Sequence, residues 1–208
     1  MRVGVRSDIR LEPPFRRATP DDAHALAELI DFAGEGMPTY LWARMAEPGE
    51  GVWDVGRRRA RREEGGFSYR NAIVAEAEDG RVVACLIGYP LPDEPGPIDR
   101  ERTPAMFVPL EELESLAAGT WYVNVLATYP EHRGRGHGTR LLALAEELAA
   151  ASGRAGLSIV VSDANGGARR LYERCGYGAV AERAMVKEDW RNAGVNWVLL
   201  AKRLPRVP

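Results

Sequence analysis

The sequence predicts an α/β fold in which helices flank a mixed sheet, and three observations support that class. Segments rich in β-branched and aromatic residues, typical of strands, alternate with segments whose apolar residues recur at helical spacing. A Glu-Asp-Gly turn at 78–80 separates two of the strand-like segments, which indicates an antiparallel hairpin. The run at 157–161 is almost continuously apolar, as is typical of a strand buried on both faces.

Local signals place the individual elements. After a strand at 15–18, Thr19 can cap a helix, Pro20 suits its first position, and two aspartates follow where the helix dipole favours them. This helix is expected to end at the glycines of 34–36. Further strands are expected at 71–76, 81–89, 120–127, 157–161, 179–186 and 197–202. Further helices are expected at 110–117, at 138–151 and from the Asn165 cap to about Arg174, with Gly176 as a left-handed exit.

The length of 208 residues favours a single domain, which we place at 15–204 after a tail or arm at 1–14. Two segments interrupt the regular pattern, and we expect insertions there, at about 36–66 and 90–119. The first insertion places aromatic residues among prolines and glycines, and we expect it to be irregular with one or two short helices.

The composition argues against several classes of protein. Lysine and arginine number 28 against 30 acidic residues, and the net charge of −2 argues against a nucleic-acid binder that is basic throughout. Two cysteines without a CxxC spacing predict neither a disulfide framework nor a zinc site. No apolar run is long enough to span a membrane and no apolar leader is recognisable, so we expect a cytoplasmic protein without a membrane partner.

An arginine-rich run, RRRARR at 57–62, allows two interpretations. It could bind phosphates or nucleic acid, or it could be a solvated helix face whose arginines pair with glutamates three or four residues away. Glu63 and Glu64 follow immediately and the net charge is negative, so the pattern favours the solvated face.

The segment YPEHRGRGHGTR at 129–140 lies between a predicted strand and a predicted helix, and it has glycines at alternate positions. Glycines let backbone approach a ligand closely, and N–H groups beside a helix N-terminus bind anions. Two arginines add charge that suits a pyrophosphate. The Walker A pattern needs a lysine that is missing here, and the dinucleotide pattern needs a glycine where Thr139 or Leu141 stands. The remaining pattern is Arg133-x-x-Gly136-x-Gly138.

This pattern resembles the acyl-CoA loop of the GNAT superfamily of N-acetyltransferases, Gln/Arg-x-x-Gly-x-Gly/Ala. A second pattern of that family, N-x-x-A-x-x-L-Y-x-x-x-G-[FY], matches position by position from Asn165 to Tyr177. The strong resemblance covers 120–178, and a weaker one covers 15–32 and 71–89. The resemblance implies a GNAT-like mixed, largely antiparallel sheet with a central, splayed pair of parallel strands.

The resemblance also implies an enzyme that moves an acetyl group from acetyl-CoA, its co-substrate, to a primary amine of a small molecule or an amino-acid-like acceptor by direct attack. The backbone of the first splayed strand would pair with pantetheine, at Leu126, Ala127 and Thr128. The loop would hold the pyrophosphate, through Arg133, Gly134, Arg135, Gly136, His137, Gly138 and Thr139. Asn165 would hydrogen-bond to the cofactor or to a loop.

Two residues are implied for the chemistry. Tyr172 stands where the family's tyrosine lies near the thioester sulfur, and a phenol of pKa about 10 is a reasonable acid for a thiolate leaving group. Many members carry a glutamate base where this chain has Asn124, which can position water or substrate but cannot take the ammonium proton. The base therefore stays open between a water chain and an amine that arrives deprotonated, and no metal is implied.

Two other functions stay open on the sequence. One is a non-catalytic acyl-CoA-binding regulatory module, which the departure at Asn124 allows. The other is an N-acetyltransferase that acts on a protein or peptide. Members of the family often pair, so a homodimer is one arrangement that the resemblance allows.

Overall fold

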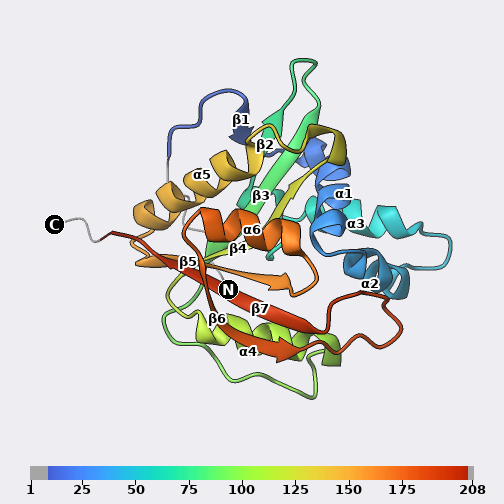
Figure 1. Cartoon of the computed structure of the whole chain (residues 1–208). Coiled ribbons are helices and arrows are strands. Elements are labelled where there is room, and N and C mark those ends of the chain that lie inside the picture. The colour runs from blue at the N-terminus through green and yellow to red at the C-terminus, as the bar shows by residue number, and fades with distance from the viewer. Residues whose placement is uncertain (1–8, 206–208) are drawn as a thin grey trace. The chain divides into compact units, whose positions relative to one another are not determined.

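The computed structural model describes residues 9–205, so residues 1–8 of the arm expected at 1–14 lie outside the described residues. Within the described range, seven strands form a sheet in the order β1-β2-β3-β4-β5-β7-β6 (Figure 1). β4 and β5 are parallel, whereas β1–β2, the predicted hairpin β2–β3, β5–β7 and β6–β7 are antiparallel. The predicted mixed, largely antiparallel sheet with flanking helices is therefore confirmed.

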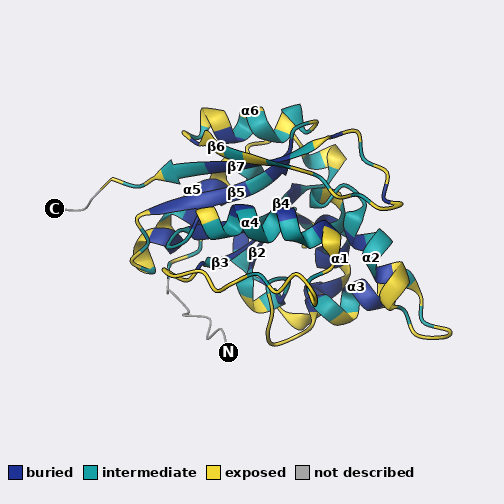
Figure 2. Ribbon diagram, turned by 90° about the horizontal axis from the view of Figure 1, so that it is seen from below, coloured by how far each residue is buried: buried dark blue, intermediate teal, exposed yellow. Residues whose placement is uncertain are grey.

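The elements lie close to their expected positions. The strands are β1 (Phe15–Arg17), β2 (Ala72–Glu76), β3 (Val82–Pro90), β4 (Trp121–Thr128), β5 (Gly156–Ser162), β6 (Gly178–Ala184) and β7 (Asn196–Arg203). The helices are α1 (Ala23–Ala33), α2 (Met37–Met45), α3 (Val52–Ala60), α4 (Val108–Leu116), α5 (His137–Ala151) and α6 (Gly166–Arg174). The insertion at 36–66 thus contains two short helices, and buried residues concentrate on β2, β3 and β5 (Figure 2).

Two compact units make up the chain. The first comprises the residues up to Tyr89 together with Asn124–Leu144, and the second comprises Pro90–Val123 and the residues from Ala145 onward. The boundary passes through β4 and α5, so each of these elements contributes residues to both units. The single domain expected at 15–204 stays a prediction.

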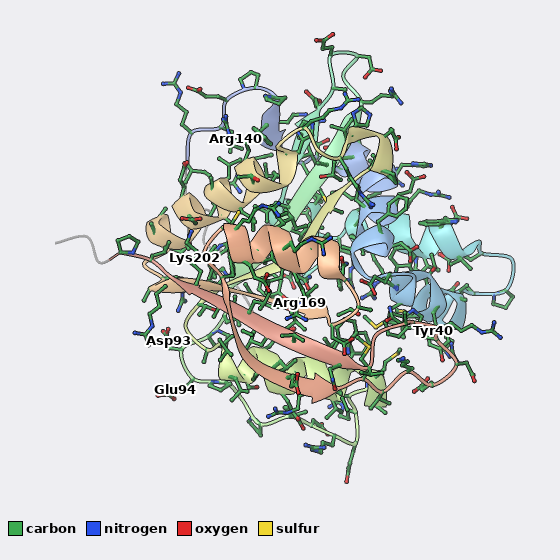
Figure 3. The ribbon with its side chains drawn as sticks, in the orientation of Figure 1. Tyr40, Asp93, Glu94, Arg140, Arg169 and Lys202 are labelled. Carbon is green, nitrogen blue, oxygen red and sulfur yellow. The ribbon has the colours of Figure 1, made fainter. Side chains whose placement is uncertain are left out.

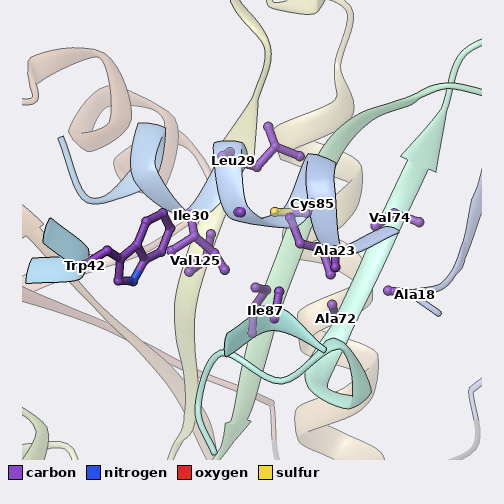
Figure 4. Close-up of a cluster of buried hydrophobic side chains, with 14 of the residues drawn as sticks. Ala18, Ala23, Leu29, Ile30, Trp42, Ala72, Val74, Cys85, Ile87 and Val125 are labelled. Carbon is purple, nitrogen blue, oxygen red and sulfur yellow. The ribbon is translucent and has the colours of Figure 1, made fainter. Parts of the chain in front are cut away.

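The core of the first unit consists of apolar side chains from α1–α3 and from β2, β3 and β4 (Figure 4), among them Leu29, Ile30, Trp42, Ile87 and Val125. α3 packs closely against Trp42 at Gly56, where an added Cβ would lie only 2.5 Å from the indole ring. Cys85 is fully buried in this core, and burial raises the pKa of its thiol to about 12. Its sulfur is therefore a packing group rather than a nucleophile.

Asp22 organises the start of α1. Its buried carboxylate accepts two bonds from the Arg16 guanidinium, at 2.7 and 2.9 Å. It also accepts the Thr19 N–H at 2.7 Å and the Thr19 hydroxyl at 3.2 Å, so the helix start is closed through the aspartate. Burial raises the pKa of Asp22, but the bonds from Arg16 and Thr19 outweigh burial and hold the pKa below its usual value.

We expect Asp22→Asn to lower the free energy of unfolding by about 2 kcal/mol at pH 7. The cost is below that of a fully buried pair because the Arg16 side chain is 35% exposed. Since the folded-state pKa is depressed, the carboxylate stabilises fully above its unfolded pKa of about 3.9, and this contribution is lost as the pH falls further. In urea unfolding, the difference in free energy of unfolding between wild type and Asp22→Asn should become smaller below about pH 4. Asp21→Asn, exposed on the same turn, is the control, and an equal loss there would contradict the assignment.

The ion pairs of the arginine run at 57–62 differ from the expected ones. Arg57 pairs at 2.6 Å with Asp54, which has the expected three-residue spacing but precedes the run, and Arg58 pairs at 3.0 Å with Glu50, eight residues before it. Glu63, which we expected to form an ion pair with an arginine of the run, pairs instead with Arg70. Arg57 and Arg58 therefore form a solvated, ion-paired face as predicted, but with other partners. Their carboxylate partners come from the segment before α3 and from the first turn of α3.

In the second unit, β5 pairs in parallel with the start of β4, where Val123 lies opposite Ile159, and pairs along its whole length with β7. It is buried along nearly all of that length, as predicted. Lys202 of β7 binds Glu146 of α5 at 2.6 Å (Figure 3), which ties the second half of α5 to the sheet.

The insertion at 90–119 is anchored through α4. Glu112 of this helix accepts bonds from Arg183 of β6 at 2.8 Å and from Arg100 at 2.5 Å. α4 also contacts β7, so the insertion is an integral layer of the second unit.

Candidate active site

The loop between β4 and α5 carries the pattern expected to bind a pyrophosphate. It begins with a 3-10 turn at Pro130–His132 and reaches α5 at His137. Gly134 and Gly136 have φ angles of +74° and +85°, which L side chains rarely adopt, and a Cβ at either position would meet no atom within 4 Å. Conformation rather than packing therefore requires glycine at both positions, and the space beside the backbone is open.

The backbone of this loop presents a row of N–H groups. Within residues 9–205, no acceptor is paired with the N–H groups from Gly134 to Thr139. The next N–H group, that of Arg140, bonds to the Gly136 carbonyl at 3.1 Å. The last of the unpaired groups belong to the first turn of α5, where the helix dipole adds positive potential. Such a turn at a helix N-terminus suits an anion such as phosphate.

Arg133 and Arg135 add positive charge to the loop and brace it. Arg133 Nε donates to the Thr128 carbonyl and Arg135 Nη2 donates to the Glu131 carbonyl, both at 3.1 Å. Burial, together with nearby positive charge, lowers the pKa of His137, so its imidazole is neutral at pH 7. The charge at this loop therefore comes from the two arginines and from the helix N-terminus.

Glu28 and Tyr129, which the sequence analysis did not single out, fix the start of the loop. The Tyr129 hydroxyl donates to the Glu28 carboxylate of α1, and its ring meets Phe32 edge-on at 5.8 Å. The Tyr129 N–H also bonds to the Val83 carbonyl of β3 at 3.0 Å. Burial and the adjacent carboxylate raise the pKa of the Tyr129 phenol, so it keeps its proton at neutral pH.

Asn124 and the residues expected to bind pantetheine follow one another on β4. Asn124 Nδ2 donates to the Gly66 carbonyl at 3.4 Å, which orients the amide and leaves Oδ1 as its acceptor. Ala127 packs in the core of the first unit, whereas Leu126 and Thr128 are partly exposed. The role of their backbone toward pantetheine stays a prediction.

The second motif lies in the second unit and forms α6. Asn165 caps this helix as predicted, since its Oδ1 accepts the Ala168 N–H at 3.1 Å, and Gly176 follows the helix at φ +87°. Tyr172 is buried, with its ring 6.0 Å from that of Tyr177. The local form of the motif is therefore confirmed, while the roles of Asn165 and Tyr172 toward a cofactor stay predictions.

Among the described residues, no cluster of three or more His, Cys, Asp or Glu side chains could hold a metal ion. In the same part of the chain, none of the helices combines the length and the apolar character needed to cross a membrane.

Comparison with known proteins identifies the family. The model of the acetyltransferase (GNAT) family matches residues 38–177, so the chain belongs to this family and is an acyltransferase. The match includes the loop between β4 and α5 and reaches the end of the motif on α6. No curated protein sequence matches the chain.

Solved structures share the fold. An acetyltransferase structure superposes with a TM-score of 0.62 at 21% identity, covering 92% of this chain and 99% of its own. An N-acetyltransferase from Staphylococcus aureus Mu50 gives 0.60 at 19% identity, covering 90% and 98% of the two chains. Naa20 from Chaetomium thermophilum, solved in complex with a bisubstrate analogue, gives 0.57 at 16% identity, covering 91% and 86%.

Proposed function

We propose that the chain transfers the acetyl group of acetyl-CoA to a primary amine of a small-molecule or amino-acid-like acceptor. The row of N–H groups from Gly134 to Thr139 carries this proposal, because it provides several donors for the diphosphate of one ligand. Membership of the acetyltransferase family supports acetyl transfer as the reaction.

The loop would bind the diphosphate with its amides while Arg133 and Arg135 balance the charge. Hydrogen bonds to charged groups contribute about 1.5–3 kcal/mol each, so a few of them suffice for tight binding. The backbone of 126–128 would pair with pantetheine, and Asn165 would contribute from the start of α6. These contacts would aim the thioester at the acceptor.

The acetyl group would move directly from the thioester to the amine. The amine nitrogen bonds to the thioester carbonyl carbon, the C–S bond breaks, and its electron pair leaves with the sulfur. The Tyr172 hydroxyl donates its proton to that sulfur and regains a proton from water, while the amine nitrogen loses its proton to water. No covalent bond to the protein forms at any point.

Asn124 would position the amine rather than deprotonate it. An amide takes no proton at neutral pH, but an oriented Oδ1 can accept an N–H bond from a neutral amine. The bond from Nδ2 to the Gly66 carbonyl provides that orientation. The acceptor would therefore have to arrive in its deprotonated form.

We expect kcat/KM for a simple amine to rise about tenfold per pH unit up to the pKa of that amine, because only the neutral form attacks. The pH at which kcat/KM stops rising is the break in the profile. For a less basic amine this break should lie at lower pH, by the difference between the pKa values of the two amines. Initial rates of CoA thiol release with amines of graded basicity measure this profile. A break at one fixed pH for every amine would reveal a base on the enzyme and contradict the role given to Asn124.

The same panel separates the other two functions. Tight CoA binding without transfer to any amine or peptide would favour the non-catalytic binding module. Transfer to peptide N-termini alone would favour a peptide acetyltransferase. Transfer to small amines is the outcome that we expect.

A further inference from the structure

The first part of the arginine run is electrically neutralised. Arg57 pairs with Asp54 at 2.6 Å, and Arg58 forms two bonds to Glu50, at 3.0 and 3.1 Å. Glu63, the first of the two acidic residues that follow the run, pairs with Arg70. These three carboxylates are therefore paired with arginines other than Arg59, Arg61 and Arg62.

No carboxylate among the described residues pairs with Arg59, Arg61 or Arg62. Arg61 Nε donates to the Pro20 carbonyl at 3.4 Å, and Arg62 Nε donates to the Arg59 carbonyl at 3.3 Å. Backbone carbonyls hold these two side chains in place but do not cancel their charge.

Arg59 has an unusual position for an uncompensated charge. It lies on α3 at three and four residues from the buried Gly56 and Val55, and therefore on the buried face of the helix. Its side chain is half-buried, yet none of its nitrogens is sealed from solvent. Burial, together with the neighbouring arginines, lowers the pKa of the guanidinium, which means that its charged form is disfavoured where it lies. An anion beside the guanidinium would stabilise that charged form.

One of these arginines, Arg62, lies close to the segment that contacts Asn124. Arg62 Nη2 is 3.3 Å from the place where a Cβ would sit on Gly65, and the carbonyl of the next residue, Gly66, accepts the Asn124 amide. The Ser68 hydroxyl donates to the Arg62 carbonyl and fixes this loop against the end of α3. Arg62 and the oriented Asn124 amide are thus connected through a short segment of the first unit, and the Arg62 Nε bond to the Arg59 carbonyl links Arg62 to Arg59.

We propose that Arg59 and Arg62 form a subsite for a carboxylate on the acceptor, so that the preferred acceptors are amino acids or other amines that carry a carboxylate. The inference rests on the proposed function, because it names the substrate class of the same enzyme. Arg59 lies in the last turn of α3 and Arg62 lies two residues past the end of the helix. Their two guanidinium groups present planar forks, which match a carboxylate bidentately.

A long polyanion fits this surface less well. Asp54 and Glu50 neutralise the neighbouring Arg57 and Arg58, so the uncompensated charge is confined to a few side chains. Nucleic-acid affinity depends on many phosphate contacts. A single anionic group of a small molecule is therefore the ligand that suits the pair.

The experiment compares the wild type with Arg59→Gln, Arg59→Lys and the control Arg58→Gln, which removes the same charge from an arginine that Glu50 already neutralises. Each protein is assayed with L-amino acids and with the matching amino-acid amides as acceptors. We expect Arg59→Gln to raise KM for the amino acids roughly 10- to 100-fold, from the loss of a charge-assisted bond, and to leave KM for the amides unchanged. KM of Arg59→Lys for the amino acids should lie between the values of wild type and Arg59→Gln, because lysine keeps the charge but lacks the planar guanidinium fork.

Calorimetry supplies a readout that does not need acetyl transfer. Acetyl-CoA should bind Arg59→Gln as tightly as wild type. L-amino acids should bind the CoA complex of the variant roughly 10- to 100-fold more weakly than that of wild type. If no amine is acetylated while amino acids still bind through Arg59, the proposed function fails and the carboxylate subsite stands. Equal KM values for acids and amides in all proteins, or a loss of acetyl-CoA affinity in Arg59→Gln, would overturn the subsite.

Discussion

Gly136→Val is expected to weaken acetyl-CoA binding roughly 100-fold or more, because it would cost at least two charge-assisted hydrogen bonds of about 1.5 kcal/mol each. Gly136 has φ +85°, and a Cβ there would project into open space beside the loop. That space is where phosphate oxygens would have to approach the N–H groups. Valine would occupy it and would also push the backbone away from its left-handed conformation. Isothermal titration with acetyl-CoA measures the loss directly.

Gly49→Val separates the loss of binding from the cost of strain. Gly49 lies between α2 and α3 at φ +87°, and a Cβ there would also meet no atom within 4 Å, so valine suffers the same backbone strain away from the loop. Both variants should lose comparable stability in thermal unfolding, while only Gly136→Val loses acetyl-CoA affinity. Normal affinity in Gly136→Val would contradict the assignment of the diphosphate to this loop.

Elements and caps could be predicted because their signals act over a few residues. The apolar run at 157–161 is a buried strand, and Asn165 caps its helix through a bond to a residue three positions away. The conformation of the loop glycines follows from the same kind of local rule, since Gly134 and Gly136 adopt positive φ. The local conformation of the candidate site could therefore be predicted wherever one continuous segment determines it.

Contacts between distant segments could not be predicted in this way. The bond from Tyr129 to Glu28 joins residues 101 positions apart, and the bond from Asn124 to the Gly66 carbonyl joins residues 58 positions apart. Nothing in the periodicity of either segment marks its partner, because the pairing depends on how α1 and the loop after α3 pack on the strands. The ion pair between Arg58 and Glu50 was not predicted for the same reason, since it joins the helix to the segment before it rather than forming along one helix face.

Tyr172→Phe is expected to lower kcat by about 10²–10⁴-fold, the usual contribution of a positioned general acid. The substitution keeps the buried ring on α6 and removes only the hydroxyl that would protonate the leaving sulfur. Affinity for acetyl-CoA should change by less than roughly tenfold, because one neutral hydrogen bond contributes about 1 kcal/mol. Steady-state rates and calorimetric titration of the same preparation separate the two quantities.

Tyr177→Phe is the matched control, since its ring lies 6.0 Å from that of Tyr172 and its hydroxyl is buried without a hydrogen-bond partner among the described residues. Removing a buried hydroxyl that makes no bond should leave kcat unchanged and should not lower the thermal midpoint. An equal fall in kcat for both variants would mean that the aromatic pair acts by packing rather than through the Tyr172 hydroxyl. Unchanged turnover in Tyr172→Phe would assign protonation of the sulfur to another group, and the loop would then bind acetyl-CoA without Tyr172 serving the chemistry.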